Sequence, residues 1–437
     1  MEAKRKIWIR RKSCMGLEKQ DSIRRRDMAG KVLALGLIIL LMGQFGVTVP
    51  VVASDDLSFH KIKVMTQNLY IGADIFAPLD GPITELPFRV AQTFEKVIES
   101  NFPARADVMT DIIARDLPDL IGLQEVFLLR KESPSDFFVN LAVDAEAEVE
   151  NGDYLNILLE KLEERGLHYH VAASVQNTDV ELPMLVCDEQ ENCWLEDLRV
   201  TDHDVILARE DIVTSNEVFL NYPDDISLQF SFDLGGGIEL TIVARRGIVA
   251  VVALVRGELF RIANTHLVVR GKDLFPAEDP RSLIASAFQA AQAQTLIAFL
   301  SNETLPVIVV GDLNSDPGDP VIPDSLTGLG YAIIPPYKQF RLNSYRDTWR
   351  TNLLKFSNPY GHTCCHDENL QNVESTLSER IDFVLVRNRF GSSLFSVLGP
   401  VFAVVEGDEE QDKTDTVPPL WPSDHGGVAA AMFIPTF

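Results

Sequence analysis

Basic residues are scarce in this chain of 437 residues. Lysine and arginine together number 39, against 64 aspartates and glutamates, so the formal net charge is −25 at pH 7. An acidic surface repels phosphate backbones and anionic lipids, which excludes tight nucleic-acid binding through charge alone unless a bound cation reverses the local potential. The acidic runs at residues 144–150 and 406–410 are interpreted as solvated faces or loops.

Linkers and repeats are also absent from the greater part of the sequence. Residues 60–437 contain no internal repeat, no low-complexity segment and no Pro- or Gly-rich stretch long enough to separate two domains. Hydrophobic residues make up 46% and charged residues 24%, the balance of a soluble globular protein with a core. The sequence therefore predicts one large domain over residues 54–437.

A long uncharged and mostly apolar run lies near the N-terminus. Residues 32–52 are mostly apolar and follow the basic cluster 24–26 and Lys31. This pattern is typical of an export signal, with a small residue, Ala53, before a cleavage point at Ser54. An uncleaved membrane anchor is the alternative, because about 20 apolar residues can span a bilayer.

Residues 1–53 are accordingly expected to be a basic segment followed by a signal peptide or signal anchor. The 31 residues before the apolar run are long for the basic part of a signal sequence, so we expect translation to start at Met28 rather than at Met1. Cleavage after Ala53 removes 11 basic and 4 acidic residues, leaving 28 basic against 60 acidic residues and a net charge of −32. The predicted location is extracellular or periplasmic, or membrane-anchored if the segment is not cut.

Cysteine is rare, with five residues in the chain. Cleavage would remove Cys14, and an even number remains, as expected for disulfides in an exported protein: Cys187, Cys193, Cys364 and Cys365. Pairing of Cys187 with Cys193 closes a short loop and leaves the adjacent pair to itself, while crossed pairings are equally consistent with the sequence. A zinc site is a further alternative because His362 and His366 flank the second pair, although the first pair lacks the usual ligand spacing.

Alternating and helical patterns follow one another along the chain. Strands are expected at residues 62–69, 120–126, 227–232, 238–244, 248–255, 259–267, 306–310, 381–386 and 428–434, and helices at 103–115, 137–165 and 282–300. Helices and strands alternate in both βαβ and hairpin order. This order predicts layered α and β elements with mixed sheets.

Polar side chains stand where several apolar strands end. Asp312 and Asn314 follow the apolar run 307–310, which a simple Asx turn would also explain. Glu125 lies near the end of a buried strand, where a carboxylate is costly unless it is paired or bound to a cation, and Asn68 ends another strand. Carboxylate and amide oxygens suit Mg²⁺, Mn²⁺ or Ca²⁺ better than zinc.

Two histidines also lie at strand ends. His266 ends one strand and His425 precedes another, and each alone could be a structural residue. Asp382 lies inside an apolar strand with only Arg380 beside it, so it needs a partner. A histidine from another strand would serve, because a carboxylate orients an imidazole and makes it more basic.

These residues occur as an ordered series of motifs: Gln67-Asn68, Gln124-Glu125-Val126, Asn264-Thr265-His266-Leu267, Gly311-Asp312-Leu313-Asn314, Arg380-Ile381-Asp382 and Ser423-Asp424-His425. From about Lys61 to the C-terminus the series resembles the endonuclease/exonuclease/phosphatase superfamily, which includes DNase I-like nucleases, apurinic endonucleases, inositol polyphosphate 5-phosphatases and neutral sphingomyelinases. The spacing of residues 361–366 from Arg380 resembles a bacterial exported subgroup. The resemblance implies a four-layered α/β sandwich, with two mixed β-sheets face to face and helices outside.

The resemblance also implies a cation site. Asn68 and Glu125 would bind Mg²⁺, or alternatively Mn²⁺ or Ca²⁺, and Asp424 would complete the ligand shell. Asp312 and Asn314 would orient the water and the phosphate, or hold a second cation.

The remaining implied roles belong to the histidines. His425, oriented by Asp382, would be the general base that prepares water for attack on phosphorus, and His266 would donate to a phosphate oxygen. Arg246 can place a guanidinium at the phosphate, although a turn with solvated arginines is the simpler interpretation of residues 245–247.

These features together predict a secreted, divalent-metal-dependent phosphodiesterase. Its specific activity is expected to be that of a sphingomyelinase or phospholipase C-like lipid hydrolase, or of a DNase I-like endonuclease. The substrate partner is therefore a phospholipid or a nucleic acid, with transient contact to a membrane surface in the first case and no stable nucleic-acid partner in either. A catalytically silent binding module is the alternative from a different class. The oligomeric state is not predicted.

Overall fold

Two β-sheets form the centre of the folded domain. The structure is a computed structural model, and it describes residues 59–235, 238–276, 278–352, 358–387 and 401–435. The predicted signal segment at residues 1–53 lies outside the described residues. Within them, the first sheet has the strand order β15-β16-β1-β2-β6-β3-β4, with β5 also paired to β6, and the second has the order β13-β14-β12-β11-β10-β7.

The first sheet contains β1 (Phe59–Asn68), β2 (Leu120–Gln124), β3 (Leu128–Glu132), β4 (Ala147–Asp153), β5 (Tyr169–Cys187), β6 (Cys193–Arg209), β15 (Phe402–Glu406) and β16 (Gly427–Pro435). The second contains β7 (Val213–Asn221), β10 (Gly247–Val255), β11 (Glu258–His266), β12 (Val307–Asp312), β13 (Arg346–Asp347) and β14 (Asp382–Arg387). A separate two-stranded sheet is the hairpin of β8 (Leu228–Gly235) and β9 (Ile238–Ala244).

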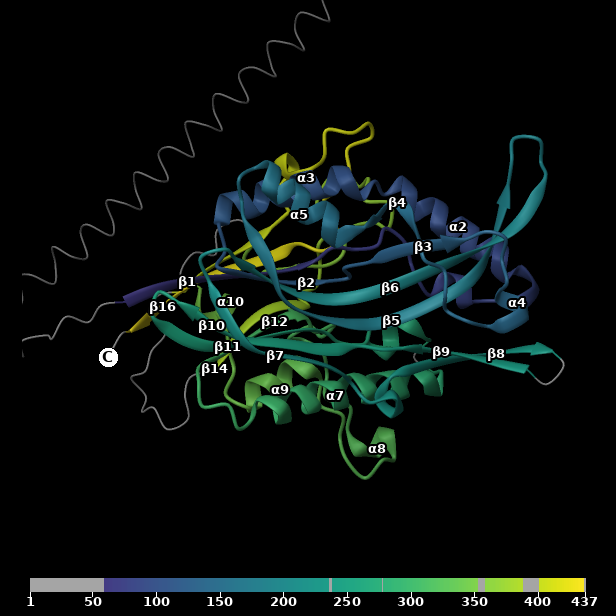
Figure 1. Cartoon of the computed structure of the whole chain (residues 1–437). Helices are drawn as coiled ribbons and strands as arrows, with labels where there is room; N and C mark the ends of the chain where they lie inside the picture. Colours follow the sequence, from purple (N-terminus) through teal and green to yellow (C-terminus); the bar gives the residue numbers. More distant parts are fainter. Residues whose placement is uncertain (1–58, 236–237, 277, 353–357, 388–400, 436–437) are drawn as a thin grey trace, which may run out of the picture. The chain divides into compact units, whose positions relative to one another are not determined.

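Helices cover the outer face of each sheet (Figure 1). Over the first sheet lie α2 (Leu86–Glu99), α3 (Phe102–Asp116) and α5 (Tyr154–Glu164), and on the far side of the second lie α7 (Pro280–Leu300) and α9 (Pro336–Leu342). Single-turn helices are α4 (Phe137–Asn140), α6 (Gly271–Leu274), α8 (Asp324–Thr327) and α10 (Thr348–Thr351), and the 3₁₀ turns are η1 (Ala77–Leu79), η2 (Ile83–Glu85), η3 (Asp224–Ile226) and η4 (Glu410–Asp412). The order helix, sheet, sheet, helix confirms the predicted four-layered α/β sandwich.

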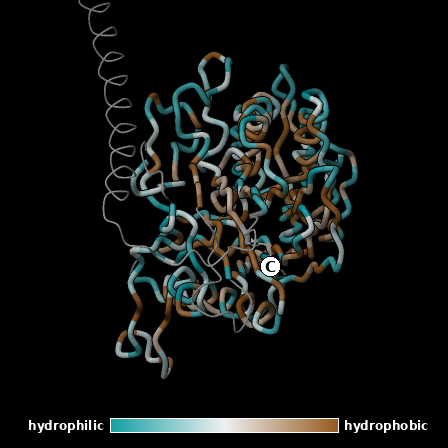
Figure 2. The backbone as a smooth tube through the Cα atoms, turned by 90° about the vertical axis from the view of Figure 1, so that its left-hand side faces the viewer, coloured by the Kyte–Doolittle hydropathy of each residue, from teal (hydrophilic) through white to brown (hydrophobic). Residues whose placement is uncertain are grey.

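Alternation along the strands explains how each sheet buries both of its faces. In β1, Ile62 and Val64 pack between the two sheets, whereas Met65 packs under α3 and α5. In β12, Ile308 and Val310 face the first sheet, whereas Val307 and Val309 pack against α7. Successive strand residues point to opposite faces, so an apolar run buries one set against a sheet and the other against helices. Figure 2 shows the hydrophobic segments concentrated in the interior.

Both sheets are mixed, as predicted. Strand β1 pairs in parallel with β2, and β11 pairs in parallel with β12, while the other pairs within the two sheets are antiparallel. Parallel neighbours need a crossover connection, and helices α2 and α3 supply it in the first sheet and α7 in the second. The carboxyl ends of these four parallel strands thus point to a common edge, where the candidate site lies.

The cysteine pairing that the sequence left open is resolved. Cys187 and Cys193 form a disulfide that joins the last pair of the β5–β6 hairpin, and the adjacent Cys364 and Cys365 form the second. Because all four sulfurs are paired, the alternative of a zinc site at this cysteine pair is wrong.

The prediction of a helix over residues 137–165 is wrong in its middle part. Helix α4 ends at Asn140, because its C-cap Leu141 has a left-handed φ of 54°, and residues 147–153 form strand β4 at the edge of the first sheet. Helix α5 starts at an N-cap, where the Asp153 side chain accepts a hydrogen bond from the Asn156 amide. The acid-rich segment pairs with β3, a contact that its own periodicity does not reveal.

Helix α7 is long and apolar enough to cross a membrane by length and composition. In the fold it is a helix of the outer layer, with Ala293, Leu296 and Leu300 packed on the second sheet. Its fully buried Gln292 accepts a hydrogen bond from the Val268 amide at 3.0 Å. A polar side chain hydrogen-bonded to the neighbouring backbone in this way fits a helix packed on a sheet of a globular domain.

Candidate active site

The predicted site residues converge at one edge of the two sheets. Asn68 ends β1 and His266 and Asp312 end β11 and β12, while Asp382 begins β14. The strand register places His266 opposite Asp312 and Asp312 opposite Asp382. Because β14 and β16 run antiparallel to β12 and β1, their first residues reach the same edge as the last residues of the parallel strands.

His425 and Asp382 form the closest pair at this edge. His425 Nδ1 lies 2.8 Å from Asp382 Oδ2, and its Nε2 lies 3.8 Å from Asp312 Oδ2 and 3.9 Å from Asp424 Oδ1. Burial lowers the pKa of His425, but the carboxylates of Asp382, Asp424 and Asp312 outweigh it and hold the pKa well above the usual value. The partnership expected from the sequence is therefore formed across 43 residues, and it leaves Nε2 facing the other acids.

An excess of buried carboxylates surrounds this pair. Burial raises the pKa of both Asp312 and Asp424 to about 7, and it also raises the pKa of Glu125. Atoms of Asp312, Asp382 and His425 lie within 4.8 Å of one another, a grouping that can hold a metal ion. Asp382 Oδ1 is buried without a hydrogen-bond partner in the described part of the chain. Oxygen donors with an uncompensated negative charge and an orphaned carboxylate oxygen fit a hard divalent cation.

Asn68 and Glu125 adjoin this group. The Asn68 amide donates from Nδ2 to Glu125 Oε1 at 3.1 Å and to Asp312 Oδ2 at 3.3 Å, while its Oδ1 accepts from the Tyr70 amide at 2.9 Å. The oxygen of Asn68 thus faces its own backbone, so ligation of a cation through Oδ1 requires the side-chain amide to turn over. The charge of Glu125 contributes to the raised pKa of Asp424. The three predicted cation ligands, Asn68, Glu125 and Asp424, therefore interact with one another directly or through their charges.

His266 is fully enclosed, and its surroundings favour the neutral ring. Burial lowers its pKa well below the usual value, and the positive charges of Arg246 and His425 lower it further. Asn314 Nδ2 lies 3.0 Å from His266 Nε2, so the ring accepts there and carries its proton on Nδ1. Nδ1 is buried without a partner among the described residues, which leaves one donor for a ligand.

Arg246 is buried, which corrects the simpler interpretation of solvated arginines. Its Nη1 lies 2.6 Å from Asp202 Oδ2, with both side chains less than a tenth exposed, whereas Arg245 pairs with Asp224 at the surface. The charges of Arg246 and Asp202 both act on the pKa of Glu125. The guanidinium is therefore in the field of the site but held by a carboxylate.

Several residues of the site were not predicted. Arg105 of α3 is fully buried and donates to the carbonyl oxygens of Leu69, Tyr70 and Pro422 at 2.8–2.9 Å, which ties the end of β1 to the segment before β16. Asp204 of β6 accepts from the His266 amide at 3.1 Å. Two acids spaced by one residue directly before the apolar run 205–208 of β6 are the signal that could have revealed Asp202 and Asp204.

The motif residues Gln124 and Asn264 link the two sheets instead of facing a ligand. Asn264 donates to the carbonyl oxygens of Leu123 and Val205 and accepts from Gln124 Nε2 at 2.6 Å. Both amides are fully buried. Such a satisfied polar network fixes the relative position of the strands that carry Glu125 and His266.

Three residues at the site have a left-handed backbone. Tyr70, Glu125 and Asn314 have φ values of 57°, 56° and 48°. Non-glycine residues adopt this region at a cost of about 1–3 kcal/mol each, and such residues cluster at functional sites. The conformation turns Glu125 and Asn314 out of their strand directions and toward the shared edge.

The Endonuclease/Exonuclease/phosphatase family matches residues 98–425, and no curated protein matches the chain. Among solved structures, an endonuclease/exonuclease/phosphatase from Beutenbergia cavernae is 18% identical with a TM-score of 0.46, over 86% of this chain and 72% of that one. A family protein from Bacteroides thetaiotaomicron is 13% identical with a TM-score of 0.45, over 86% and 96%. Truncated TDP2 from Caenorhabditis elegans is 15% identical with a TM-score of 0.40, over 85% and 97%.

Proposed function

Because the chain belongs to the endonuclease/exonuclease/phosphatase family, we propose that it is a divalent-cation-dependent phosphoesterase that hydrolyses phosphodiesters. The observation that carries this proposal is the Asp382–His425 pair, whose facing atoms are 2.8 Å apart beside Asp312 and Asp424. A buried imidazole fixed by a carboxylate on one nitrogen presents the other nitrogen to a reacting water.

A cation fits the acids of this edge. Asn68, Glu125 and Asp424 would hold it, and when bound it would neutralise phosphate charge and lower the pKa of a water molecule. We propose Mg²⁺, with Mn²⁺ or Ca²⁺ as alternatives that offer the same preference for oxygen ligands. The acids that raise the pKa of His425 are in part those that would face the cation, so their neutralisation favours the unprotonated imidazole that a base requires.

The residues of the chain have separate roles in this reaction. His425 Nε2 takes a proton from water as the water oxygen bonds to phosphorus. The bond from phosphorus to the leaving oxygen breaks, and that oxygen departs with the bonding electrons and takes up a proton from solvent to become an alcohol. Asp382 holds the imidazole through Nδ1. Neutral His266 donates from Nδ1 to a phosphate oxygen, and Asp312 and Asn314 orient the water and the phosphate.

We further propose that the enzyme is exported, because an uncharged apolar run precedes the acidic domain. Its substrate is then an extracellular or periplasmic phospholipid or nucleic acid. The acidic charge makes a stable nucleic-acid complex unfavourable in either case. A catalytically silent binding module is the remaining alternative, and a direct activity measurement separates the two.

The test is hydrolysis of bis-p-nitrophenyl phosphate in the presence of Mg²⁺, Mn²⁺, Ca²⁺ or EDTA. The protein is expressed with its own N-terminus and purified after any cleavage by the cell. We expect activity that requires a divalent cation. His425→Ala and Asp382→Asn should each lower kcat by about 10²–10⁴-fold, because they remove or misorient the base.

The matched control is His170→Ala, which changes an exposed histidine on β5 and should leave kcat unchanged. Circular dichroism and thermal unfolding of each variant show whether the fold is kept. A folded wild-type protein that is inert with every cation, on this substrate and on sphingomyelin, plasmid DNA, RNA and nucleotide monoesters, would identify a binding module instead.

A further inference from the structure

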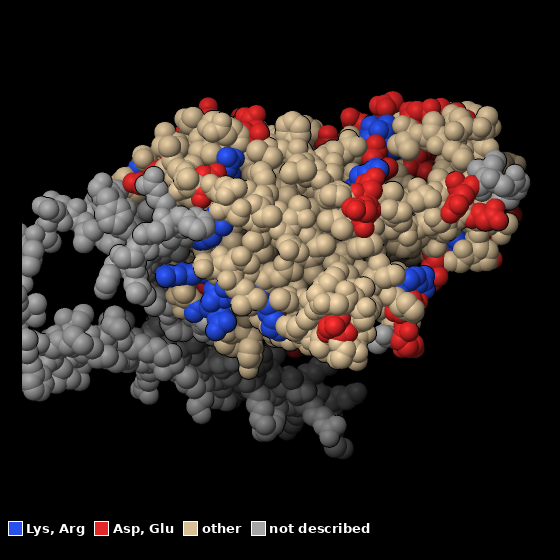
Figure 3. Space-filling view, turned by 90° about the horizontal axis from the view of Figure 1, so that it is seen from below, with Lys and Arg blue, Asp and Glu red and all other residues tan. Residues whose placement is uncertain are grey.

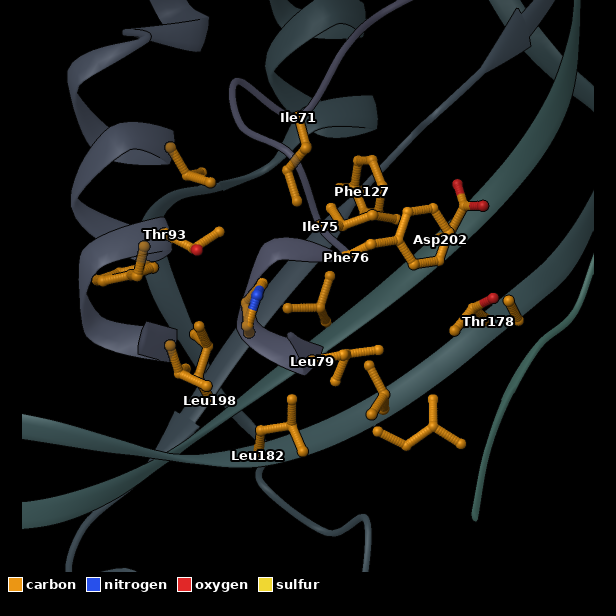
Figure 4. A pocket seen from close by; sticks show the side chains of 18 of the residues that line it. Ile71, Ile75, Phe76, Leu79, Thr93, Phe127, Thr178, Leu182, Leu198 and Asp202 are labelled. Carbon is orange, nitrogen blue, oxygen red and sulfur yellow. The ribbon is translucent and has the colours of Figure 1, made fainter. Parts of the chain in front are cut away.

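An apolar pocket lies next to the candidate active site. It has a volume of about 100 Å³ and lies between β3, β5 and β6 of the first sheet, helix α2, the segment of residues 71–79 and the β8–β9 hairpin. Its lining is almost wholly aliphatic and aromatic (Figure 4). The polar exceptions lie mainly toward one end, where Asp202 and Arg246 contribute to the wall.

The polar end of the pocket adjoins the site itself. Ile71 lines the pocket with its side chain, while its amide donates to Glu125 Oε2 at 3.3 Å. Phe127 lines the same end and follows Glu125 by two residues. Figure 4 shows Ile71, Phe127 and Asp202 at one end and Leu182 and Leu198 at the other. A molecule that reached from the cation site into the pocket would pass from charged groups to apolar ones.

The pocket is not an ordinary gap within the core. Protein interiors are close-packed, and apolar cavities that remain exclude water and take up apolar molecules. Several lining side chains are only partly buried, among them Ile75, Phe76, Leu79 and Phe230. Phe76 and Phe230 meet from the two sides, with ring centroids 5.4 Å apart. A partly exposed apolar rim around a hollow is what a binding site for an apolar group presents.

A second hollow continues this surface. Leu79 and Phe230 also line a more open depression of about 500 Å³, together with Phe275, Ile284 and Phe288. Ile284 of α7 is 49% exposed there. An apolar group too long for the first pocket can therefore extend along β8, over a depression that Ser227, Gln229, Ser231 and Arg281 also line.

We propose that the pocket binds the alkyl chain of a lipid phosphodiester, so that the substrate class of this enzyme is an amphiphilic phosphodiester rather than a nucleic acid. The inference rests on the proposed phosphoesterase function for the position of the headgroup. Apolar contact suits this chain in particular, because a protein with a net charge of −25 cannot hold a polyanion through its general surface charge. The phosphate then needs only the local cation, and the alkyl chain supplies the rest of the binding.

The first test is the dependence of kcat/KM on chain length for p-nitrophenyl alkyl phosphates from methyl to octyl, measured as monomers in solution. Each buried methylene should raise kcat/KM about fourfold until the pocket is full. Ala244→Phe fills the pocket from β9 and should flatten this dependence, and Leu182→Ala enlarges its deep end and should move the plateau to longer chains. The matched control is Thr241→Phe on the exposed side of the same strand, which should keep the wild-type dependence.

Two results would overturn the inference while leaving the proposed function intact. One is hydrolysis of the methyl ester with no rise toward longer chains. The other is hydrolysis of plasmid DNA with a kcat/KM above that of the best alkyl ester and unaltered by Ala244→Phe.

A binding measurement keeps the inference testable even if no substrate is turned over. Titration calorimetry with octyl phosphate in EDTA should show binding with a negative heat-capacity change. The affinity should fall at least tenfold in Ala244→Phe and stay unchanged in Thr241→Phe. Equal binding by the wild-type protein and Ala244→Phe would overturn the pocket assignment. Octyl phosphate binding without any phosphoesterase activity would support the pocket and count against the proposed function.

Discussion

His366 is a buried histidine whose surroundings favour the neutral ring. It stacks on Trp421 with centroids 4.3 Å apart, and its Nδ1 accepts from Asn372 Nδ2 at 3.1 Å and from the Thr376 amide at 3.3 Å. The Lys413 ammonium nitrogen lies 4.5 Å from the centroid of the same Trp421 ring. Burial lowers the pKa of His366 to about 4. A neutral ring that accepts two hydrogen bonds at Nδ1 would lose both on protonation there.

We expect His366 to make stability depend on pH below neutrality. Its pKa is about 6.5 in the unfolded chain and about 4 in the fold, so the unfolded chain takes up the proton first as pH falls. The contribution is present in full above about pH 6.5 and is lost as pH falls toward 4. At pH 5 this preferential proton uptake by the unfolded chain lowers the free energy of unfolding by about 2 kcal/mol. His366→Gln lacks this loss, so the stability difference between wild type and variant should narrow by that amount from pH 7.5 to pH 5 in urea titrations.

The control for this experiment is His170→Gln, which changes an exposed histidine. Its unfolding free energy should run parallel to that of the wild type over the same pH range. A parallel course for His366→Gln as well would contradict the assignment.

At the scale of the elements, the two sheets are in close contact at Gly122 of β2. A Cβ atom there would overlap the Val310 Cγ2 methyl of β12 and come 2.9 Å from Asn264 Cγ of β11. The absence of a side chain thus lets β2 pack directly on the strands that carry His266 and Asp312. The same contact region contains the Gln124–Asn264 hydrogen bond, so packing and polar links together set the spacing of the site.

Gly122→Ala should destabilise the protein by about 1–3 kcal/mol, because an added methyl overpacks a filled interface. Val310→Ala removes the methyl that it would strike. In chemical denaturation, the double variant should therefore be more stable than the sum of the two single effects predicts, by at least about 0.5 kcal/mol.

A second pairing shows whether this coupling is specific. Val255 belongs to the same core between the sheets but is not among the nearest neighbours of Gly122. The changes in unfolding free energy caused by Gly122→Ala and Val255→Ala should therefore add. Additivity in the Val310 cycle would show that the sheets are not in contact at Gly122.

At the scale of the whole molecule, charge is divided unevenly along the chain. The first 53 residues hold 11 basic and 4 acidic residues, so they carry positive charge, and the remainder carries −32. On the face formed by α7, α8 and α9, Figure 3 shows a wide central area without charged side chains, acidic groups toward one end and one edge, and a group of Lys and Arg toward the other end. Among the described residues, the basic groups on this face do not extend across its central area, which agrees with a substrate held by few local contacts.

We expect the basic N-terminal segment to be absent from the exported protein. Intact mass and N-terminal sequencing of protein expressed with its own N-terminus should give a product that begins at Ser54, because signal peptidases cut after small residues. Replacing Ala53 by a bulky residue, Ala53→Phe, should block the cut and leave the protein in the membrane fraction. A mature product that still carries residues 4–26 would contradict both the cleavage and the expected start at Met28.

Much of the fold could be predicted because its signals are local. The alternation in residues 62–69, the apolar run at 307–310 and the helical pattern at 282–300 each match an observed element. The segment 137–165 was misassigned because β4 forms only by pairing with β3. Helix α2 and the long β5–β6 hairpin were not predicted, and β5 is partnered by a strand whose pairing no short window reveals.

The candidate site shows the same division. Asp382 could be paired with a distant histidine because an isolated acid in an apolar strand requires a partner. The Arg246–Asp202 pair and the amide link between Gln124 and Asn264 could not, because each joins strands from separate parts of the chain. Arg105 gives no local sign that its guanidinium holds three carbonyl oxygens from two segments.

The sequence by itself determined the order of the motifs, the alternation that sends each strand residue to a sheet or a helix layer, and the acidic balance of the chain. These properties depend on residues close together in the chain or on composition. Only the tertiary structure decided the disulfide pairing, the direction in which Asn68 presents its amide, and the apolar pocket beside Glu125. The pocket draws its wall from segments between residues 71 and 246, which come together only when the sheets, α2 and the β8–β9 hairpin are packed in place.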